Sequence, residues 1–377
     1  MKNLKNLKIA IVYDRVNKWG GAERVLLALH EMFPNAPLFT SVYDKKNASW
    51  ARIFPKIYTS FLQKIPLLNK KHELLGWIMP LAFESFDFSD FDLVISVTSE
   101  AAKGIITKPS TFHICYMLTP TRYLWSHKKY YFKNKILEKI SKPVIDYLKQ
   151  WDLIASCKPD KIIAISTAVK NRIKKYYQKD SEVIFPPVDV PLIMTKDYLD
   201  GEYYLIVSRL VGYKRVDLAV EVFNELNLPL MIVGTGSDEK KLKYIANSNI
   251  SFTGMVSDEE LMEIYKKSKA FIMPQEEDFG IAGVEAQYYG KPVISFKKGG
   301  SLDTVIEGRT GMFFNEQTKA SLTSAIALFD KMSFNHNYIR RYAEKYNKDR
   351  FKRELQKSLI RAYIVWRGRN KVVAKIT

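Results

Sequence analysis

Residues 274–311 read PQEEDFGIAGVEAQYYGKPVISFKKGGSLDTVIEGRTG and contain the pattern that decides the fold. A strand is predicted at 271–274, directly before a Phe-Gly-Ile turn, and an apolar helix is predicted at 283–289. A second strand follows at 293–296 and leads into a Gly-Gly loop. A strand, a helix and a second strand in this order form the unit from which parallel α/β sheets are built.

The alternation of strands and helices continues on both sides of this stretch. Upstream of it, strands are predicted at 203–208, 230–233 and 250–253, and helices at 215–226, 239–246 and 258–267. The first half is less regular, with predicted strands at 8–14, 93–97, 112–117 and 161–165 and an apolar helix at 22–32. After residue 335 the pattern is helical, charged and aromatic. Strands that alternate with amphipathic helices are typical of doubly wound parallel sheets, so we predict an α/β protein.

The length of the chain and a single clear linker predict two domains. The 377 residues are too many for one compact core and fit two α/β domains. The linker begins with the sequence PPVD at residue 186 and ends at Gly201, where proline stiffens the crossing between domains. We therefore expect a Rossmann-like domain over 1–190, a second over 191–345, and a C-terminal helix over 346–377.

The composition favours a cytoplasmic protein. No uninterrupted apolar run approaches about 18 residues, so no membrane span is expected. The first residues, MKNLKNLKIAIVYD, lead straight into a strand pattern and lack a small-residue cleavage site, so no signal peptide is predicted. The two cysteines, Cys115 and Cys157, form neither a disulfide framework nor a metal set, which fits a reducing compartment.

The net charge of +19 indicates an anionic partner. Basic residues cluster at 56–71, 128–142, 170–179 and 361–375. The sequence has no helix-turn-helix, zinc-finger or RNA-binding signature, so only the charge favours nucleic acid, and we predict no nucleic-acid partner. The segment 61–83 mixes large apolar residues with lysines, a composition suited to an anionic membrane surface. The alternative for this segment is a core-facing helix with a solvated basic face.

Two acids in the 274–311 stretch are candidate ligands of a sugar nucleotide. Glu277 precedes the tight turn and can reach sugar hydroxyls, and Glu285 lies in the following helix and can accept from a ribose diol. Backbone N–H groups at Gly280 and Ile281 can face a phosphate at the helix N-terminus. The alternative is an ordinary strand-loop-helix with a solvated acidic rim, but the whole pattern favours the nucleotide site.

A basic loop, SRLVGYK at 208–214, follows the first strand of the second domain. Arg209 offers a planar fork of donors and Lys214 a compact charge. Both are expected where a diphosphate leaving group develops charge, in place of a metal ion. Read alone, the loop is equally consistent with a surface basic loop.

Three further segments are predicted to contribute to the same cleft. Gly20 and Gly21 follow the first strand of the chain and allow close approach of backbone to a diphosphate. Gly234 belongs to a small turn at the end of a strand. Backbone groups near Val256, in the segment GMVSD at 254–258, are candidates to contact the base, while Ser257 or Asp258 caps the next helix.

These residues resemble a known family, the retaining glycosyltransferases of family 4, which have the GT-B fold of two Rossmann-like domains facing a central cleft. The resemblance is strongest over 203–311, where the Glu-x7-Glu motif matches Glu277 and Glu285. It implies that Arg209 and Lys214 bind the donor diphosphate, that Glu277 contacts the donor sugar and that Glu285 contacts the ribose. It implies donor contacts for Phe279, Gly280 and Ile281, approach of the Gly20-Gly21 loop from the other domain, and a C-terminal helix that crosses back to the N-terminal domain. It also implies that the Rossmann-like domain over 1–190 is the acceptor-side domain and that the one over 191–345 is the nucleotide-sugar-binding domain.

Within the family, the chain resembles mannosyltransferases of surface-polysaccharide and O-antigen assembly. The string HICYMLTPTRYLW at 113–125 carries this likeness. Relatives often have a histidine directly before Thr-Pro, beside the donor sugar, whereas this chain has Leu118, which cannot donate a hydrogen bond. Either a nearby group such as His113 or His127 substitutes, or the site works without a histidine, or the activity is altered. His113 is expected chiefly as a strand residue, and His127 on an acceptor-side loop.

The resemblance implies transfer of a hexose from a nucleoside diphosphate sugar to an acceptor with retention of the anomeric configuration. We expect GDP-mannose as donor, a glycan or polyprenyl-linked glycan as acceptor, and a peripheral position at the inner membrane face. No cofactor or metal is expected. The Asp90-Phe91-Asp92 string imitates the Asp-x-Asp of metal-dependent transferases, but it lies on the approach to a buried strand and is interpreted as a surface edge. The alternatives are a non-catalytic or altered sugar-nucleotide-binding protein and a sugar-nucleotide epimerase of similar architecture.

Overall fold

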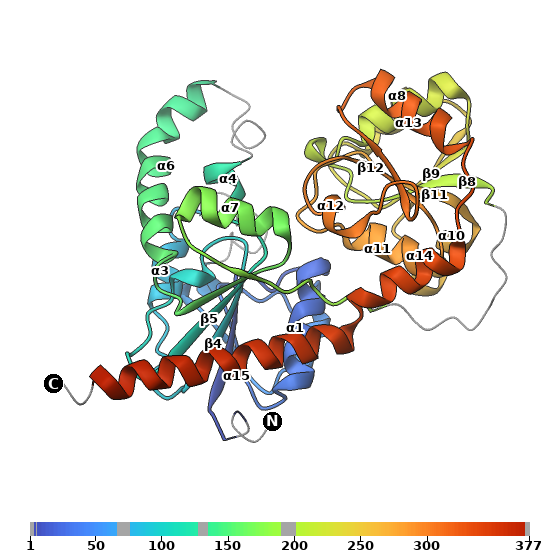
Figure 1. Ribbon diagram of the computed structural model, residues 1–377. Helices are drawn as coiled ribbons and strands as arrows, with labels where there is room; N and C mark the ends of the chain where they lie inside the picture. The colour runs from blue at the N-terminus through green and yellow to red at the C-terminus, as the bar shows by residue number, and fades with distance from the viewer. Residues whose placement is uncertain (1–3, 5, 66–75, 127–134, 190–200, 374–377) are drawn as a thin grey trace. The chain divides into compact units, whose positions relative to one another are not determined.

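The computed structural model describes the chain except for residues 1–3, 5, 66–75, 127–134, 190–200 and 374–377 (Figure 1). The chain divides into two compact units. Unit 1 comprises Met1–Pro187 and Lys348–Thr377, and unit 2 comprises Val188–Asn347. The expected divisions after residues 190 and 345 lie close to these limits.

Unit 1 is built on a seven-stranded parallel sheet with the strand order β3-β2-β1-β4-β5-β6-β7. The strands are β1 Ile9–Tyr13, β2 Leu38–Thr40, β3 Ile57–Thr59, β4 Leu93–Thr98, β5 Phe112–Met117, β6 Lys161–Ala164 and β7 Glu182–Val183. Every residue of β1, β4 and β5 is buried. Central strands of parallel sheets are covered on both faces, which explains why they read as continuous apolar runs in the sequence.

Helices cover this sheet and connect its strands. They are α1 Gly21–Met32, α3 Met79–Glu84, α4 Arg122–Trp125, α6 Lys135–Ala155, α7 Thr167–Tyr177 and α15 Lys348–Val373, with the short 3-10 helices η1 Ser49–Ile53, η2 Phe61–Lys64 and η4 Ala102–Gly104. The C-terminal helix α15, red in Figure 1, packs on β5 through ring contacts of Phe112 with Trp366 and of Tyr116 with Phe351, at centroid distances of 5.2 Å and 5.7 Å. Helix α15 thereby contributes to the core of unit 1.

Unit 2 is built on a six-stranded parallel sheet with the strand order β10-β9-β8-β11-β12-β13. The strands are β8 Tyr203–Val207, β9 Leu230–Val233, β10 Ile250–Gly254, β11 Ser268–Met273, β12 Val293–Phe296 and β13 Gly311–Phe314. The helices are α8 Val216–Leu226, α9 Glu239–Ile245, α10 Asp258–Lys267, α11 Ile281–Tyr288, α12 Ser301–Thr304, α13 Lys319–Phe329 and α14 His336–Ala343, with the short 3-10 helices η5 Gly212–Lys214 and η6 Glu344–Tyr346. The prediction of an α/β protein with two doubly wound, Rossmann-like domains is confirmed.

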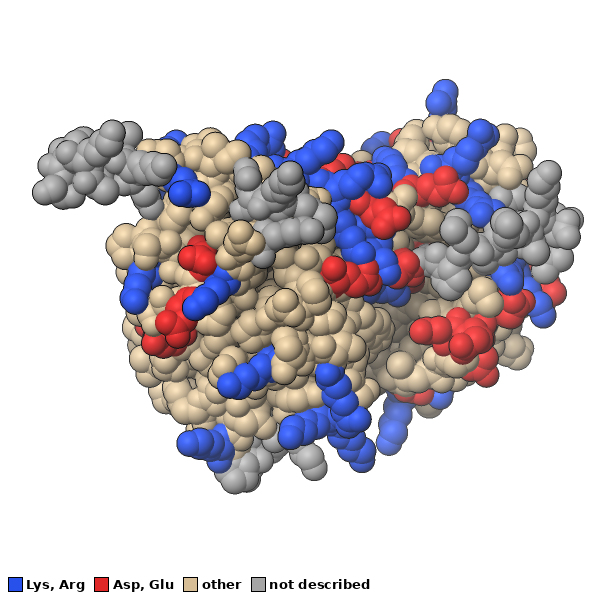
Figure 2. Space-filling view, turned by 90° about the horizontal axis from the view of Figure 1, so that it is seen from below, with Lys and Arg blue, Asp and Glu red and all other residues tan. Residues whose placement is uncertain are grey.

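The basic residues do not form one continuous surface on the face seen in Figure 2. Lysine and arginine side chains are spread over this face, interspersed with acidic side chains and broad uncharged areas. Among the described residues, no helix is both long and apolar enough to cross a bilayer.

Candidate functional site

The topology of unit 2 places two loops at a reversal of the strand order. From β8 the chain moves outward to β9 and β10, and from β11 it moves outward to β12 and β13 on the other side. At such a reversal the loops that follow the two central strands diverge, and ligands bind at the carboxyl ends of those strands. The loops concerned are 208–215, after β8, and 274–280, after β11.

A cation from one loop meets an acid from the other. The Lys214 ammonium group contacts Glu277 Oε1. Gln275 Nε2 donates a hydrogen bond to the same oxygen at 2.7 Å. The Lys214 and Glu277 side chains are only 12% and 17% exposed, so the pair is shielded from water and still reachable by a ligand. The structure therefore brings together two residues that the sequence singled out separately.

Arg209 lies on the same loop as Lys214 but takes a more exposed position. Its guanidinium donates a hydrogen bond to the Tyr213 hydroxyl at 2.6 Å. The backbone of this loop is anchored by Leu210, which is fully buried and whose N–H donates to Thr235 O at 2.9 Å. The roles of Arg209 and Lys214 toward a diphosphate stay predictions.

The glycine pair of the 274–311 stretch fixes the backbone that carries Glu277. Gly300 N–H donates to Glu277 O at 2.8 Å, and Gly299 pairs with Glu277 in an isolated parallel bridge. A Cβ at Gly300 would lie 2.3 Å from Phe279 Cα, which is closer than any real contact. Only glycine allows the two loops to lie this close together, so this pair positions Glu277, a role that the sequence did not reveal.

The turn after Glu277 leads into α11. Gly280 precedes the helix with φ at 90°, a left-handed conformation that glycine adopts without strain. The positive end of the helix at Ile281 favours a negatively charged ligand. Phe279 is 3% exposed, and its ring packs edge-on against Tyr346 at 5.4 Å between centroids. The Phe279 side chain thus belongs to the interior of unit 2. The donor contact of this residue stays a prediction and would involve its backbone.

Glu285 lies in α11 and is held by a tyrosine that sequence reasoning missed. Its carboxylate accepts a hydrogen bond from the Tyr265 hydroxyl at 3.0 Å, and Glu285 is 8% exposed. Tyr265, from α10, stacks on Tyr289 with centroids 5.3 Å apart. The contact orients the carboxylate of Glu285, whose predicted role toward a ribose stays a prediction.

Two other residues of unit 2 that were predicted to contact the donor make contacts within the protein itself. The Gly234 N–H donates to Gly254 O at 2.8 Å, so a donor contact at Gly234 would use another backbone atom. Val256 is partly buried and packs against the core that contains Tyr265. The predicted cap is confirmed at Ser257, whose hydroxyl accepts from Glu260 N at 3.2 Å in a capping box.

The remaining sequence candidates lie in unit 1. Gly20 is the residue before α1 and has an extended backbone that any residue can adopt, and Gly21 begins the helix. Asp92 Oδ2 accepts the Lys8 N–H at 2.8 Å ahead of β4, and Asp90 is exposed, as expected for a surface edge. Leu118 is half-buried directly after β5.

The structure tests one of the two histidines that were proposed as substitutes at this position. His127 lies outside the described residues. His113 is fully buried near the start of β5, at the end of the strand remote from Leu118. Its Nε2 lies 2.8 Å from Ser96 Oγ. The prediction that His113 is a strand residue is confirmed, and the alternative that it serves the site is wrong, because its side chain is part of the core.

The buried His113 predicts a pH-dependent stability of unit 1. Burial, aided by the Lys158 charge, lowers the pKa of His113 from 6.5 to about 3. Between these values the unfolded chain binds a proton that the folded chain does not, so the stability of unit 1 falls as the pH falls. The expected slope is about 1.4 kcal/mol per pH unit.

Urea unfolding at pH 7 and pH 5, followed by tryptophan fluorescence, measures this slope. All six tryptophans lie in unit 1, so the signal reports on this unit. The His113→Gln variant should lose this part of the pH dependence. Equal slopes in the variant and the wild type would contradict the assignment.

Comparison with known proteins agrees with this architecture. Residues 195–346 match the model of the family Glycosyl transferases group 1. The chain is 25% identical over 206 residues to the D-rhamnosyltransferase WbpZ of Pseudomonas aeruginosa, covering 52% of this chain and 54% of that protein. It is 26% identical over 206 residues to the O-antigen chain mannosyltransferase C of Escherichia coli, covering 50% of this chain and 51% of that protein. The chain thus spans about half the length of these curated relatives.

The solved structures extend the likeness to nearly the whole chain. The crystal structure of Anabaena Alr3699/HepE in complex with UDP and glucose superposes with a TM-score of 0.67 at 17% identity, covering 94% of this chain and 99% of that one. At this identity the likeness concerns the fold. The two Rossmann-like units have the GT-B fold, and the segment matched by the family model contains Lys214, Glu277 and Glu285.

Proposed function

We propose that this protein is a retaining glycosyltransferase that moves a hexose from a nucleoside diphosphate sugar to a hydroxyl of a glycan or lipid-linked glycan. The observation that carries the proposal is the Lys214–Glu277 pair at the carboxyl ends of β8 and β11. The Lys214 ammonium group can bind a diphosphate, and the Glu277 carboxylate can accept hydrogen bonds from sugar hydroxyls. Both residues lie within the segment that matches the family model.

The proposed mechanism relies on positioning and on stabilisation of the leaving group. Lys214 and Arg209 would meet the charge that grows on the diphosphate as its bond to the sugar breaks. The N-terminus of α11 would add its partial positive charge to the same oxygens. Glu277 would hold the sugar, so that the acceptor oxygen attacks the carbon that the diphosphate leaves. Both substrates are thus oriented by fixed groups, and reaction on one face of the sugar retains the configuration.

The donor we propose is GDP-mannose. The mannosyltransferase name of a relative supports mannose, whereas the structural neighbour in complex with UDP and glucose makes UDP-glucose the main rival. Slow donor hydrolysis without acceptor, measured with GDP-mannose, UDP-glucose and UDP-N-acetylglucosamine, tests the activity and the donor together. Hydrolysis of none of the three would reject transfer from these donors.

We further propose that transfer does not need a metal ion, since Arg209 and Lys214 supply the positive charge. Hydrolysis of the preferred donor should survive excess chelator. Complete loss that manganese restores would refute this part of the proposal.

A second candidate function is a nucleotide-sugar-binding protein that does not transfer. Leu118 favours it, because a leucine stands at the carboxyl end of β5 where the resembling family often has a histidine. A binder of this kind would be stabilised by one nucleotide sugar in a thermal-shift panel and would hydrolyse none of them. A transferase would give both signals.

The lipid-linked acceptor and the peripheral membrane position are supported by apolar side chains exposed on unit 1. Phe61, Ile65, Trp77 and Leu81 are 40%, 39%, 51% and 54% exposed, and the exposed Lys64 lies among them. Their neighbours Leu62, Met79 and Phe83 are buried in one core cluster, so the exposed side chains belong to elements anchored in the core. The structure describes residues 61–65 and 76–83 of this segment, and both parts contain buried and exposed apolar residues. Residues 66–75 lie outside the described residues.

Replacing both Trp77 and Leu81 with serine should weaken binding to anionic vesicles about tenfold or more, because each side chain gains about 1.5–3 kcal/mol when fully buried in an apolar phase. Sedimentation with phosphatidylglycerol vesicles, and with phosphatidylcholine vesicles as reference, measures the change. The matched control is Leu302→Ser, a leucine 55% exposed in unit 2. Failure of the wild type to bind either vesicle would reject the membrane position.

A further inference from the structure

Unit 1 contains the same reversal of strand order as unit 2. From β1 the chain moves outward to β2 and β3, and from β4 it moves outward to β5, β6 and β7. The residues that follow β1 and β4 therefore lie where open α/β sheets bind ligands. Asp14 and Arg15 follow β1, and Ser99 and Glu100 follow β4.

A cation and an acid meet at this second reversal as well. Arg15 Nη2 lies 2.5 Å from Glu100 Oε2, and the two side chains are 19% and 10% exposed. Lys214 and Glu277 have the same arrangement in unit 2. In both units a basic residue follows one central strand and an acidic residue follows the other, and both side chains are largely buried but still accessible to a ligand. Because the two sheets differ in sequence and strand number, the shared feature is the position in the topology.

The loop that carries Glu100 is held by Asp14. The Asp14 carboxylate accepts hydrogen bonds from the backbone N–H groups of Ser99, Ala101 and Ala102 at 2.7, 2.9 and 2.9 Å. The Thr98 hydroxyl donates to the same carboxylate at 2.8 Å. The position of Glu100 is therefore set by the fold, as a binding group requires.

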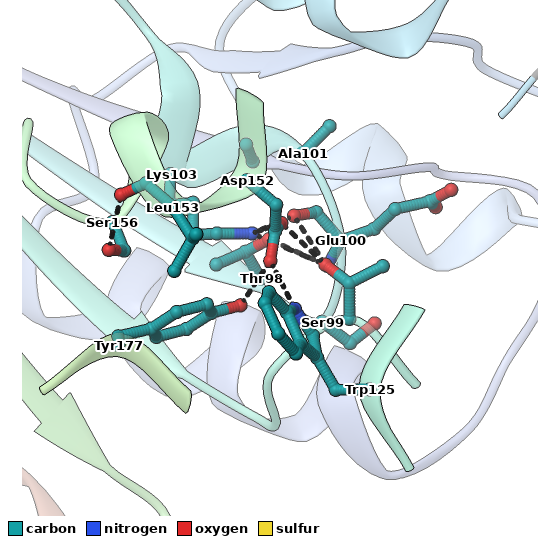
Figure 3. Close-up of polar contacts among 12 residues, drawn as sticks. Thr98, Ser99, Glu100, Ala101, Lys103, Trp125, Asp152, Leu153, Ser156 and Tyr177 are labelled. Carbon is teal, nitrogen blue, oxygen red and sulfur yellow. Dashed lines mark hydrogen bonds and ion pairs between the residues drawn. The ribbon is translucent and has the colours of Figure 1, made fainter. Parts of the chain in front are cut away.

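A buried network supports Glu100 from the protein side (Figure 3). The Lys103 ammonium contacts Glu100 O and forms an ion pair with Asp152 at 2.6 Å. Figure 3 shows Trp125 and Tyr177 converging on the same Asp152 carboxylate. This network contacts Glu100 through its main-chain carbonyl oxygen. The Glu100 carboxylate instead contacts Arg15 and the Tyr123 hydroxyl, which lies 3.2 Å from Oε1.

Two observations indicate that this pair serves a ligand. Arg15 Nε is buried and has no hydrogen-bond partner within the described part of the chain, although a buried N–H of this kind is normally satisfied. A cavity of about 10 Å³, enough for one hydroxyl-sized group, lies beside the acid; its lining includes Glu100, Thr121 and Tyr123 but not Arg15. Burial also raises the pKa of the Glu100 carboxyl, against the opposing effect of the Arg15 guanidinium. A ligand that donates to Glu100 and accepts from Arg15 would offset these costs.

We propose that Arg15 and Glu100 form a hydroxyl-binding subsite for a sugar of the acceptor, which rests on the proposed transfer function. One hydroxyl of the sugar donates to the carboxylate, and an oxygen of the same or a neighbouring hydroxyl accepts from the guanidinium. A phosphate is disfavoured because Glu100 would repel it, and a metal ion is disfavoured because Arg15 would repel it. A neutral polyhydroxylated ligand satisfies both groups at once.

Binding of octyl α-D-mannopyranoside, octyl β-D-glucopyranoside and octyl β-D-galactopyranoside, measured by ligand-observed NMR titration, tests the subsite directly. The wild type should bind at least one of them, and Glu100→Gln and Arg15→Met should weaken that binding about tenfold or more, because each removes a charged hydrogen-bonding partner. The matched control is Glu182→Gln, which removes an acid of unit 1 that pairs with Lys161 at 2.5 Å and lies on the edge strand β7. It should leave glycoside binding unchanged.

Nucleotide-sugar binding by the same samples separates the two proposals. Loss of glycoside binding by the variants, with nucleotide-sugar binding intact, supports the subsite. Failure of the wild type to bind any nucleotide sugar rejects the proposed function, and the glycoside measurement can then still be interpreted by itself. If Glu100→Gln does not fold by tryptophan fluorescence, Tyr123→Phe removes only the hydroxyl beside Glu100 Oε1 and should still weaken binding several-fold. Equal glycoside affinity in the folded variants and the wild type, or no glycoside binding by the wild type, would overturn the subsite.

Discussion

Replacing Lys214 with methionine is expected to lower donor turnover by about a hundredfold or more, because the change removes a preorganised positive charge from the leaving group. Methionine keeps much of the length and apolar character of the lysine stem, so the effect should come from the charge. Lys214 is 12% exposed and contacts Glu277, so its loss also leaves a shielded carboxylate without this cation. The measurement is kcat and KM for hydrolysis of the preferred donor, with thermal unfolding of unit 2 recorded in parallel.

The control for this experiment is Lys297→Met. Lys297 pairs with Glu307 at 3.0 Å, is 43% exposed, and belongs to the same unit. Exposed pairs of this kind contribute about 0–1 kcal/mol, so turnover should be unchanged. Arg209→Ala should lower turnover in the same direction as the loss of Lys214. Full activity of Lys214→Met would remove this residue from the site and, with it, the observation on which the proposed function depends.

The central strands could be predicted from the sequence, because a strand buried on both faces consists of consecutive apolar residues. This was so for β5 and β9, whose predicted limits agree with the structure, and for β12 after the helix α11. Strands of two or three residues give no such signal. β2 and β3 contain three residues each and β7 contains two, which is too few for any period to appear. β13, which contains four residues, was also not predicted; it begins at Gly311, and glycine is unfavourable in a strand pattern.

The candidate site could be predicted where each residue follows its own strand. Lys214 and Glu277 lie at the ends of predicted strands, and parallel topology brings such ends to one edge of a sheet. Contacts between side chains distant in the sequence could not be predicted in this way. The bond from Tyr265 to Glu285 and the pair formed by Arg15 and Glu100 depend on helix packing and strand order, which no local pattern encodes.

The same limit applies to the charged groups that the fold buries. Lys103 and Asp152 have no motif in the sequence, yet both side chains are only 1% exposed and their polar atoms lie 2.6 Å apart. The Asp152 carboxylate also accepts hydrogen bonds from the Tyr177 hydroxyl at 2.6 Å and from Trp125 Nε1 at 2.7 Å. The network therefore ties η4, α4, α6 and α7 together behind the Arg15–Glu100 pair.

Replacing Lys103 with methionine should lower the free energy of unfolding of unit 1 by about 3–5 kcal/mol, because it leaves a buried carboxylate without its cation. Urea unfolding followed by tryptophan fluorescence measures the loss in unit 1. The double variant Lys103→Met, Asp152→Leu should recover part of it, since removing both charges also removes the cost of burying one alone. The control Lys174→Met breaks the exposed pair with Asp180, whose side chains are 60% and 93% exposed, and should change stability little. A loss in Lys103→Met no larger than in this control would show that the buried carboxylate finds compensation without lysine, and that the support of Glu100 does not depend on this charge.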